Sequence, residues 1–155
     1  MSATSMTKSA PADPVKAYAT FRVTGDQLVP DQVTRLLKIV PTLAYAKGQH
    51  YSGGPRSPDL IGRTGVWYFC TDGIVAGIRP ADHLAFLLRQ VVPGPAFQQF
   101  LKRKALEVVI TAFWHGPAEA KQPSIPRALA DRLKQIPARI ETDFDQGDAG
   151  DRHAA

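Results

Sequence analysis

The chain has 155 residues, of which 44% are hydrophobic and 21% are charged. This is the composition of an ordinary globular domain, and it argues against a disordered chain or a membrane protein. A chain of this length buries about two-thirds of its unfolded surface, which predicts one domain with one core. The formal net charge of +5 favours an anionic partner, such as nucleic acid or a phosphorylated ligand.

Residues 1–14 are rich in Ser, Thr, Ala and Pro and contain no apolar run. They predict a disordered leader, with neither a secretory signal nor a membrane span. Residues 15–145 are expected to form a single α+β domain, and residues 146–155 a flexible tail. Cys70 is the only cysteine, so no intrachain disulfide and no thiolate metal cage can form. A cytoplasmic protein is therefore expected.

Hydrophobic periodicity and turn residues divide the domain into strands and helices. In chain order we expect a strand over 15–24, a helix over 30–39, a short strand over 42–46, a strand over 62–71, two helical segments between 79 and 104 broken at 93–95, a strand over 107–115, a helix over 126–136 and a strand over 138–145. This order predicts an α+β ferredoxin-like sandwich, with a mostly antiparallel sheet and its helices on one face.

Two neighbouring segments in the middle of the chain stand out. The segment Gly62–Thr71 is a nearly continuous apolar run, which predicts a central strand buried on both faces. The segment Lys47–Ile61 before it is rich in Gly and Pro, so we expect a long loop without regular structure. Long loops in compact domains often carry function, and this one is a candidate binding segment.

Several short motifs occur in a fixed order between Tyr18 and Asp145. They are Thr24-Gly25-Asp26-Gln27-Leu28, Pro30-Asp31, Leu36-Leu37, Ile39-Val40-Pro41-Thr42, Lys47-Gly48 and Arg63-Thr64-Gly65-Val66-Trp67, followed by Asp143 in the last strand. This ordered set resembles the DUF4279 domain family of small, uncharacterised bacterial proteins. Val29 departs from the family's acidic or small polar residue, and Lys38 from its glycine. The resemblance implies a shared fold and no activity, because the family has no established one.

No residue is assigned a catalytic role. The histidines at 50, 83, 115 and 153 lack the close spacing of a zinc site, so neither a metal nor a cofactor is expected. The glycines of the loop do not form a phosphate-binding motif, and Cys70 lies in an apolar strand where a thiol is usually inert. An enzyme alternative would require His50, His115 and Arg63 to converge, because imidazole suits general acid-base chemistry near neutral pH.

Two groups of side chains are candidates for binding a ligand or partner. The first lies in and beside the loop and comprises Lys47, His50, Tyr51, Arg56 and Arg63. The second is expected on the sheet face away from the helices and comprises Tyr18, Arg22, Phe113 and His115. Trp67 is predicted to lie in the core. The run Lys102 to Lys104 is predicted to end a helix, where cations complement the macrodipole.

The predicted function is a non-catalytic binding or protein-interaction module, with an immunity or accessory role. Its expected partner is a protein or an anionic ligand, and no membrane is involved. Binding of single-stranded nucleic acid through the aromatic and basic sheet face is the alternative, since ferredoxin-like RNA binders stack bases in this way.

Overall fold

The computed structural model describes residues 15–91 and 94–147. The predicted leader over residues 1–14 lies outside these ranges, as do residues 148–155 of the predicted tail. The elements in chain order are β1 (Lys16–Gly25), α1 (Pro30–Leu37), β2 (Leu43–Tyr45), β3 (His50–Tyr51), β4 (Leu60–Ile61), β5 (Gly65–Cys70), α2 (Pro80–Gln90), α3 (Pro95–Arg103), β6 (Glu107–Gly116), α4 (Arg127–Leu133) and β7 (Arg139–Gln146). Every long element predicted from periodicity is therefore present, with shifted ends.

Five strands form one mixed sheet in the order β2-β5-β1-β6-β7. Strand β1 pairs antiparallel with β5 and with β6, and β2 pairs antiparallel with β5. Strand β7 runs parallel to β6, to which α4 connects it. The α+β class is confirmed, and the sheet is mixed because the chain returns through α4 before its last strand.

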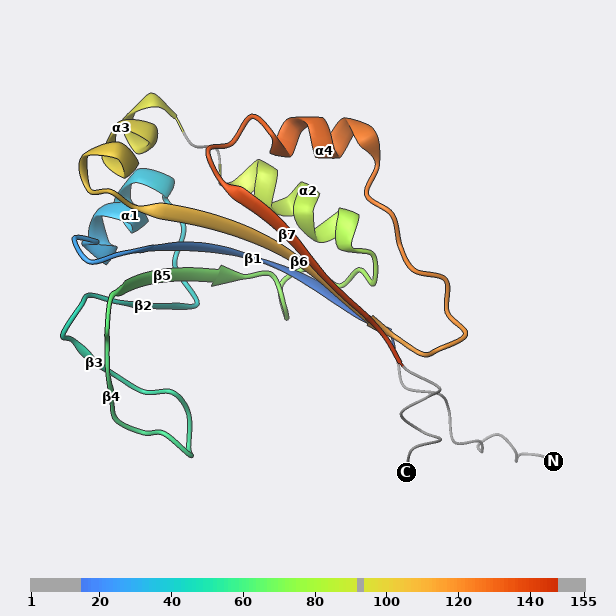
Figure 1. Cartoon of the computed structure of the whole chain (residues 1–155), viewed down its shortest axis with the longest axis horizontal. Coiled ribbons are helices and arrows are strands. Elements are labelled where there is room, and N and C mark those ends of the chain that lie inside the picture. The colour runs from blue at the N-terminus through green and yellow to red at the C-terminus, as the bar shows by residue number, and fades with distance from the viewer. Residues whose placement is uncertain (1–14, 92–93, 148–155) are drawn as a thin grey trace.

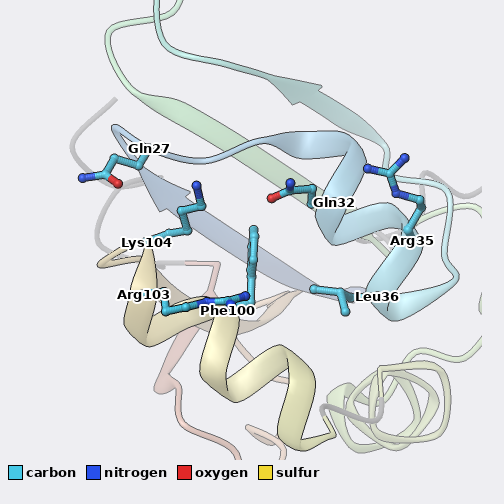
Figure 2. Close-up of a pocket in the computed structure, with 7 residues that line it drawn as sticks. All are labelled: Gln27, Gln32, Arg35, Leu36, Phe100, Arg103 and Lys104. Carbon is cyan, nitrogen blue, oxygen red and sulfur yellow. The ribbon is translucent and has the colours of Figure 1, made fainter.

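The helices α1, α2, α3 and α4 lie together on one side of this sheet, as Figure 1 shows. Helices α1 and α3 cover one end, and a groove lies between them (Figure 2). Helices α2 and α4 cover the other end. Helix α3 ends at Arg103, so the basic run from Lys102 ends a helix as predicted. None of the helices within residues 15–91 and 94–147 is long and apolar enough to cross a bilayer.

Strand β5 differs from its prediction in two ways. It is the second strand from the edge of the sheet, and β1 is the central one. Its side chains alternate between buried and half-buried, with Trp67 and Phe69 in the core and Tyr68 on the opposite face. The prediction of two buried faces was wrong because aromatic and β-branched residues occupy both sides of this strand, and composition alone does not separate them.

The segment Lys47–Ile61 contains regular structure that was not predicted. Strands β3 and β4 pair antiparallel and form a small hairpin. The turn between them is closed by hydrogen bonds between Gly53 and Ser57 and from the Ser57 amide to the Gly54 carbonyl. Gly54 has a positive φ of 110°, a conformation that glycine adopts without steric cost. The glycines therefore shape the hairpin's turn instead of preventing strands.

Trp67 lies at the centre of the core with no exposed surface, which confirms its predicted place. Its ring packs edge-on against Phe21, with centroids 6.2 Å apart and planes at 87°. Its indole Nε1 donates a hydrogen bond to Thr34 Oγ1 at 3.0 Å. Thr34 belongs to α1, so this one side chain joins β5 to the helical layer and satisfies its own polar atom there.

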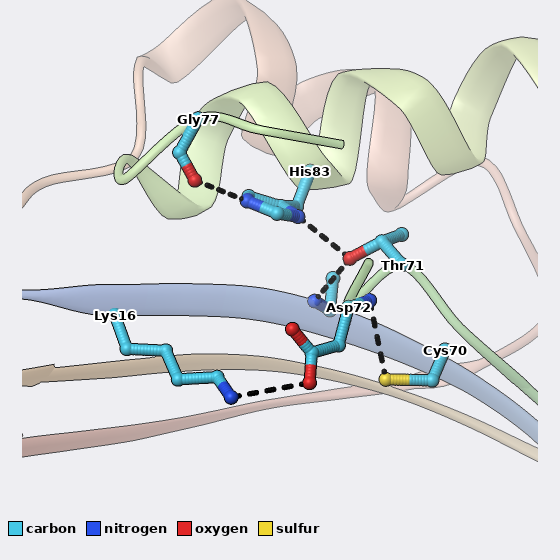
Figure 3. A network of polar contacts seen from close by, with 7 residues as sticks. Lys16, Cys70, Thr71, Asp72, Gly77 and His83 are labelled. Atoms are coloured by element: carbon cyan, nitrogen blue, oxygen red, sulfur yellow. Dashed lines mark hydrogen bonds and ion pairs between the residues drawn. The ribbon is translucent and has the colours of Figure 1, made fainter. Parts of the chain in front are cut away.

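A buried polar network joins α2 to the sheet (Figure 3). His83 of α2 is 1% exposed, and its Nε2 lies 2.7 Å from the Gly77 carbonyl oxygen. The carbonyl only accepts, so Nε2 donates, and Nδ1 accepts from the Thr71 hydroxyl at 2.6 Å. Thr71 Oγ1 also accepts from the Ala19 amide at 2.9 Å. The network therefore ties the end of β5, the start of α2 and strand β1 together.

Helix α1 ends at Leu37 because Lys38 has left-handed backbone angles, with φ 58° and ψ 39°. This conformation crowds any Cβ atom and favours glycine, the residue that the family resemblance implies here. We therefore expect Lys38→Gly to raise the free energy of unfolding by about 0.5–1 kcal/mol. Urea denaturation of both proteins measures the change. Lys38→Ala is the control, since it removes the ammonium group and keeps the Cβ atom, and an equal gain from it would contradict the backbone explanation.

Candidate binding face

The side of the sheet opposite the helices is uncovered by any element of the described chain (Figure 1). We call it the open face. It consists of Lys16, Tyr18, Thr20 and Arg22 of β1; Leu43 and Tyr45 of β2; Val66, Tyr68 and Cys70 of β5; Val109, Thr111, Phe113 and His115 of β6; and Arg139, Glu141, Asp143 and Asp145 of β7. Four of the predicted site residues, Tyr18, Arg22, Phe113 and His115, lie together on this face.

Arg22 lies in the middle of the open face. It is exposed, and it stands opposite Tyr68 in the register of β1 and β5. No ion pair within residues 15–91 and 94–147 involves its guanidinium. Arg22 is also close enough to Tyr68 and Tyr45 to favour ionisation of both phenols. An arginine among half-buried tyrosines offers hydrogen-bond donors and flat apolar surface at the same place.

Burial raises the pKa of Tyr68 to about 12, and the neighbouring Cys70 adds to the rise. Burial likewise raises the pKa of Tyr45 to about 12, with a further contribution from Tyr51, and Arg22 opposes both shifts. Both phenols are therefore neutral at physiological pH and keep their O–H groups as donors. The centre of the open face carries one positive charge, that of Arg22.

The end of the open face where β1 begins is aromatic and acidic. Tyr18 and Phe113 stack with centroids 4.6 Å apart and planes at 17°. His115 Nδ1 lies 3.2 Å from a carboxylate oxygen of Asp145. Tyr18, Phe113 and His115 line a hollow of about 310 Å³. The rest of its lining is Lys16, Trp114, Asp143 and Asp145. The acidic side chains come from β7, which is parallel to β6 and places Asp143 beside Phe113.

The β3–β4 hairpin projects from the sheet on the side away from the helices, so it borders the open face (Figure 1). Tyr51 of the hairpin stacks on Tyr45 of β2, with centroids 3.8 Å apart and planes at 3°. This contact fixes the base of the hairpin against the edge of the face. Tyr51 is thereby joined to the open face, as an extension of its aromatic surface.

The other predicted loop residues do not converge on one point. Lys47 pairs with Asp26 at 3.3 Å, and His50 Nδ1 lies 2.8 Å from Asp59 within the hairpin. Arg56 is exposed in the hairpin's turn, and Arg63 is exposed just before β5 begins. These four basic side chains lie in or beside the hairpin, and Asp26 and Asp59 offset two of them.

The residues of the enzyme alternative lie at opposite ends of the sheet. His115 is opposite Lys16, the first residue of β1, whereas Gly65, two residues after Arg63, is opposite Gly25 at the other end. Strand β1 has 10 residues and therefore spans about 30 Å from one end to the other. His50 is in the hairpin, paired with Ile61 on the Arg63 side. General acid-base chemistry needs groups within hydrogen-bond reach or one bridging water, so this trio does not form a catalytic site.

Two tyrosines of the open face, Tyr45 and Tyr68, were missing from the predicted site. The signal for Tyr68 is present in the sequence, because positions 66, 68 and 70 of β5 alternate with the core residues 67 and 69. The signal for Tyr45 is weaker, since β2 has three residues and its pattern is too short to show a period. Its role follows from pairing with β5 and from the stack with Tyr51.

The fold and the open face together define a small α+β domain in which helices cover one face of the sheet and leave the other uncovered. Residues 15–147 match the family model described as Domain of unknown function (DUF4279). The chain therefore belongs to the DUF4279 family, as its motifs indicated. No curated protein and no solved structure matches it.

Proposed function

We propose that this protein is a non-catalytic interaction module that binds a protein partner through the open face. The observation that carries the proposal is the row of half-buried tyrosines around Arg22 at the centre of that face. Tyrosine and arginine, together with tryptophan, are enriched among the residues that contribute most to binding at protein interfaces.

The charges around the centre favour a protein over a nucleic acid. The β7 side of the open face carries Glu141, Asp143 and Asp145, and only Arg139 of β7 is basic there. Arg139 already pairs with Glu141 at 2.9 Å and with Glu107 at 3.6 Å. A phosphate backbone crossing the face would meet these carboxylates, which repel it. In addition, Tyr18 and Phe113 already stack on each other, so each has one ring face fewer for a base.

Single-stranded nucleic acid remains the second candidate function, because stacked aromatics and Arg22 lie on one sheet surface. It predicts that binding of an oligonucleotide weakens steeply with salt and that Tyr18→Ala or Phe113→Ala weakens it further. The protein proposal predicts no saturable binding of an oligonucleotide at physiological salt. A fluorescence-anisotropy titration at two salt concentrations separates the two.

The fold is also proposed to be ferredoxin-like with one added strand. In support, the order β2-β5-β1-β6 has antiparallel neighbours throughout, and helices precede β2 and β6 in the chain. Strand β7 then extends the edge beside β6. An accessory or immunity role in the cytoplasm fits a binding domain with one half-exposed cysteine, Cys70, that has no disulfide partner.

The proposal is tested by capturing partners from cells that express the protein, with the purified chain as bait. The wild type is expected to retain a defined protein after nuclease treatment, and Arg22→Glu to reduce its yield about tenfold or more, as for an interface-centre residue. Arg132→Glu on α4 is the control, because it makes the same charge change on an exposed residue of the helical side. Equal losses from both variants, or loss of the partner on nuclease treatment, would contradict the proposal.

A further inference from the structure

A second candidate site lies on the helical side, away from the open face. It is a groove of about 580 Å³ between α1 and α3, which we call the α1–α3 groove. Its lining comprises Gln27, Gln32, Arg35 and Leu36 from α1 and the turn before it, and Phe100, Arg103 and Lys104 from α3 and its end (Figure 2). This volume is within the range of about 300–1,000 Å³ that is usual for small-molecule sites.

The groove is basic, with three cationic side chains and no carboxylate in its lining. No ion pair within residues 15–91 and 94–147 involves Arg35, Arg103 or Lys104. Three uncompensated positive charges along one hollow repel one another and attract an anion. The groove therefore has the electrostatics of an anion site.

Two acidic side chains of an adjoining hollow already have partners. Lys104 also lines an adjoining hollow that contains Asp26 and Glu107. Asp26 pairs with Lys47, and its pKa is held below the usual value by a hydrogen bond from Thr64 and then by Lys47. Glu107 pairs with Arg139 at 3.6 Å. These carboxylates are thus engaged elsewhere, and the charge of Lys104 is available to the groove.

The side chains are distributed along the groove, as Figure 2 shows. Lys104 and Gln27 lie at one end, and Arg35 and Leu36 lie at the other. The Phe100 ring stands between the two helices, and the Gln32 amide faces the groove from α1. An elongated anion would meet a cation at each end and the Gln32 amide between them.

We propose that the α1–α3 groove binds a small molecule that carries a diphosphate or a longer phosphate chain. Three positive charges match the roughly three negative charges of a diphosphate at neutral pH, since the second ionisation of a phosphate group is near pH 6. Arginine guanidinium groups bind phosphate oxygens through paired N–H donors, and lysine adds a point charge. A single phosphate carries at most about two negative charges, fewer than the three cations of the groove.

Helix ends alone do not explain this arrangement. Arg35 lies in the last turn of α1 and Arg103 in that of α3, where cations complement the macrodipole. Lys102 shares the last turn of α3 and has the same dipole benefit, yet it does not line the groove. Lys102 is therefore the comparison residue for the experiment, a helix-end cation outside the groove.

The experiment is isothermal titration of the full chain with inorganic pyrophosphate, tripolyphosphate, orthophosphate and citrate at physiological salt. Pyrophosphate and tripolyphosphate are expected to bind at least about tenfold more tightly than orthophosphate or citrate, which corresponds to one further charge-assisted contact. Arg35→Glu and Arg103→Glu are each expected to weaken pyrophosphate binding by about tenfold or more. Lys102→Glu is expected to weaken it by less than about threefold, since exposed charges contribute little.

Thermal melts check that each variant is folded before it is titrated. Absence of binding by any of the four probes to the wild type would overturn the proposal, as would citrate binding as tightly as pyrophosphate. Equal weakening by Lys102→Glu and Arg103→Glu would also overturn it, because a diffuse positive field would then explain the data. None of these outcomes bears on the open face, which lies on the other side of the sheet.

Discussion

Trp67→Ala is expected to lower the free energy of unfolding by about 3–5 kcal/mol, the usual cost of removing a large buried aromatic side chain. Trp67 has no exposed surface, and its indole contacts Phe21 and donates to Thr34 Oγ1. The variant loses the packing of the core beneath α1 and leaves a cavity there. Since small domains are stable by about 5–15 kcal/mol, it should unfold at a markedly lower urea concentration.

Two comparisons make the Trp67 result specific. Trp67→Phe keeps most of the apolar volume and loses the bond to Thr34, so about 1–2 kcal/mol is expected, near the cost of one hydrogen bond and a smaller ring. Phe113→Ala removes a half-exposed ring of the open face and should cost about 1 kcal/mol. If Phe113→Ala were as destabilising as Trp67→Ala, the assignment of one face to the core and the other to binding would be wrong.

His83→Ala is expected to cost about 2–4 kcal/mol, because it removes a buried ring and leaves two polar groups without partners. The Gly77 carbonyl loses its donor, and the Thr71 hydroxyl loses its acceptor. Thr71→Val, which keeps the shape of the side chain, should cost about 1–3 kcal/mol because the Ala19 amide then loses its acceptor. Urea denaturation of each variant measures these changes.

The double variant that combines His83→Ala with Thr71→Val tests whether the hydrogen bonds of this buried network are energetically coupled. Its cost should be smaller than the sum of the two single costs, since both substitutions break the same bond. Lys16→Ala is the control, because it breaks only the exposed ion pair with Asp72 near the same turn (Figure 3), and a change within about 0.5 kcal/mol is expected. Strict additivity of the His83 and Thr71 effects would show that their contact is not energetically significant.

Alternation along β1 and β6 was sufficient to predict which side chains occupy the open face. Tyr18 and Arg22 alternate with the core residues Phe21 and Val23, so their direction follows from strand geometry alone. Phe113 follows in the same way from β6. Periodicity does not show which strands pair with each other. For this reason, the position of Arg22 opposite Tyr68 was not predicted, and neither was the acidic β7 edge beside Phe113.

The buried His83 network and the α1–α3 groove were not predicted, because both depend on contacts between segments far apart in the sequence. The bond between His83 and Thr71 depends on how α2 settles on the sheet, and an isolated histidine in a helix gives no sign of it. The α1–α3 groove depends on Arg35 lying across from Arg103, although the basic run at Lys102 was visible in the sequence. Such sites arise from tertiary packing, which local patterns do not encode.

Val29 and Lys38, the two residues that depart from the pattern implied by the family resemblance, lie at the two ends of α1. Val29 is the N-cap residue, and its side chain makes no capping hydrogen bond. Lys38 is the C-cap residue, in the left-handed conformation. A polar residue at the first position and glycine at the second are what these ends favour. Helix α1 is therefore held mainly by the burial of Val33 and Leu37 and by the contact of Thr34 with Trp67.

The most direct test of the open face as a protein-binding surface is site-specific photo-crosslinking in living cells. A photoreactive phenylalanine derivative at Leu43, which is on the open face and 37% exposed, is compared with the same group at Lys134, at the end of α4 on the helical side. A protein-binding open face should give a discrete protein adduct from position 43 that disappears when Arg22→Glu is added, and none from position 134. Adducts with nucleic acid at position 43, or the same protein adduct from both positions, would contradict it.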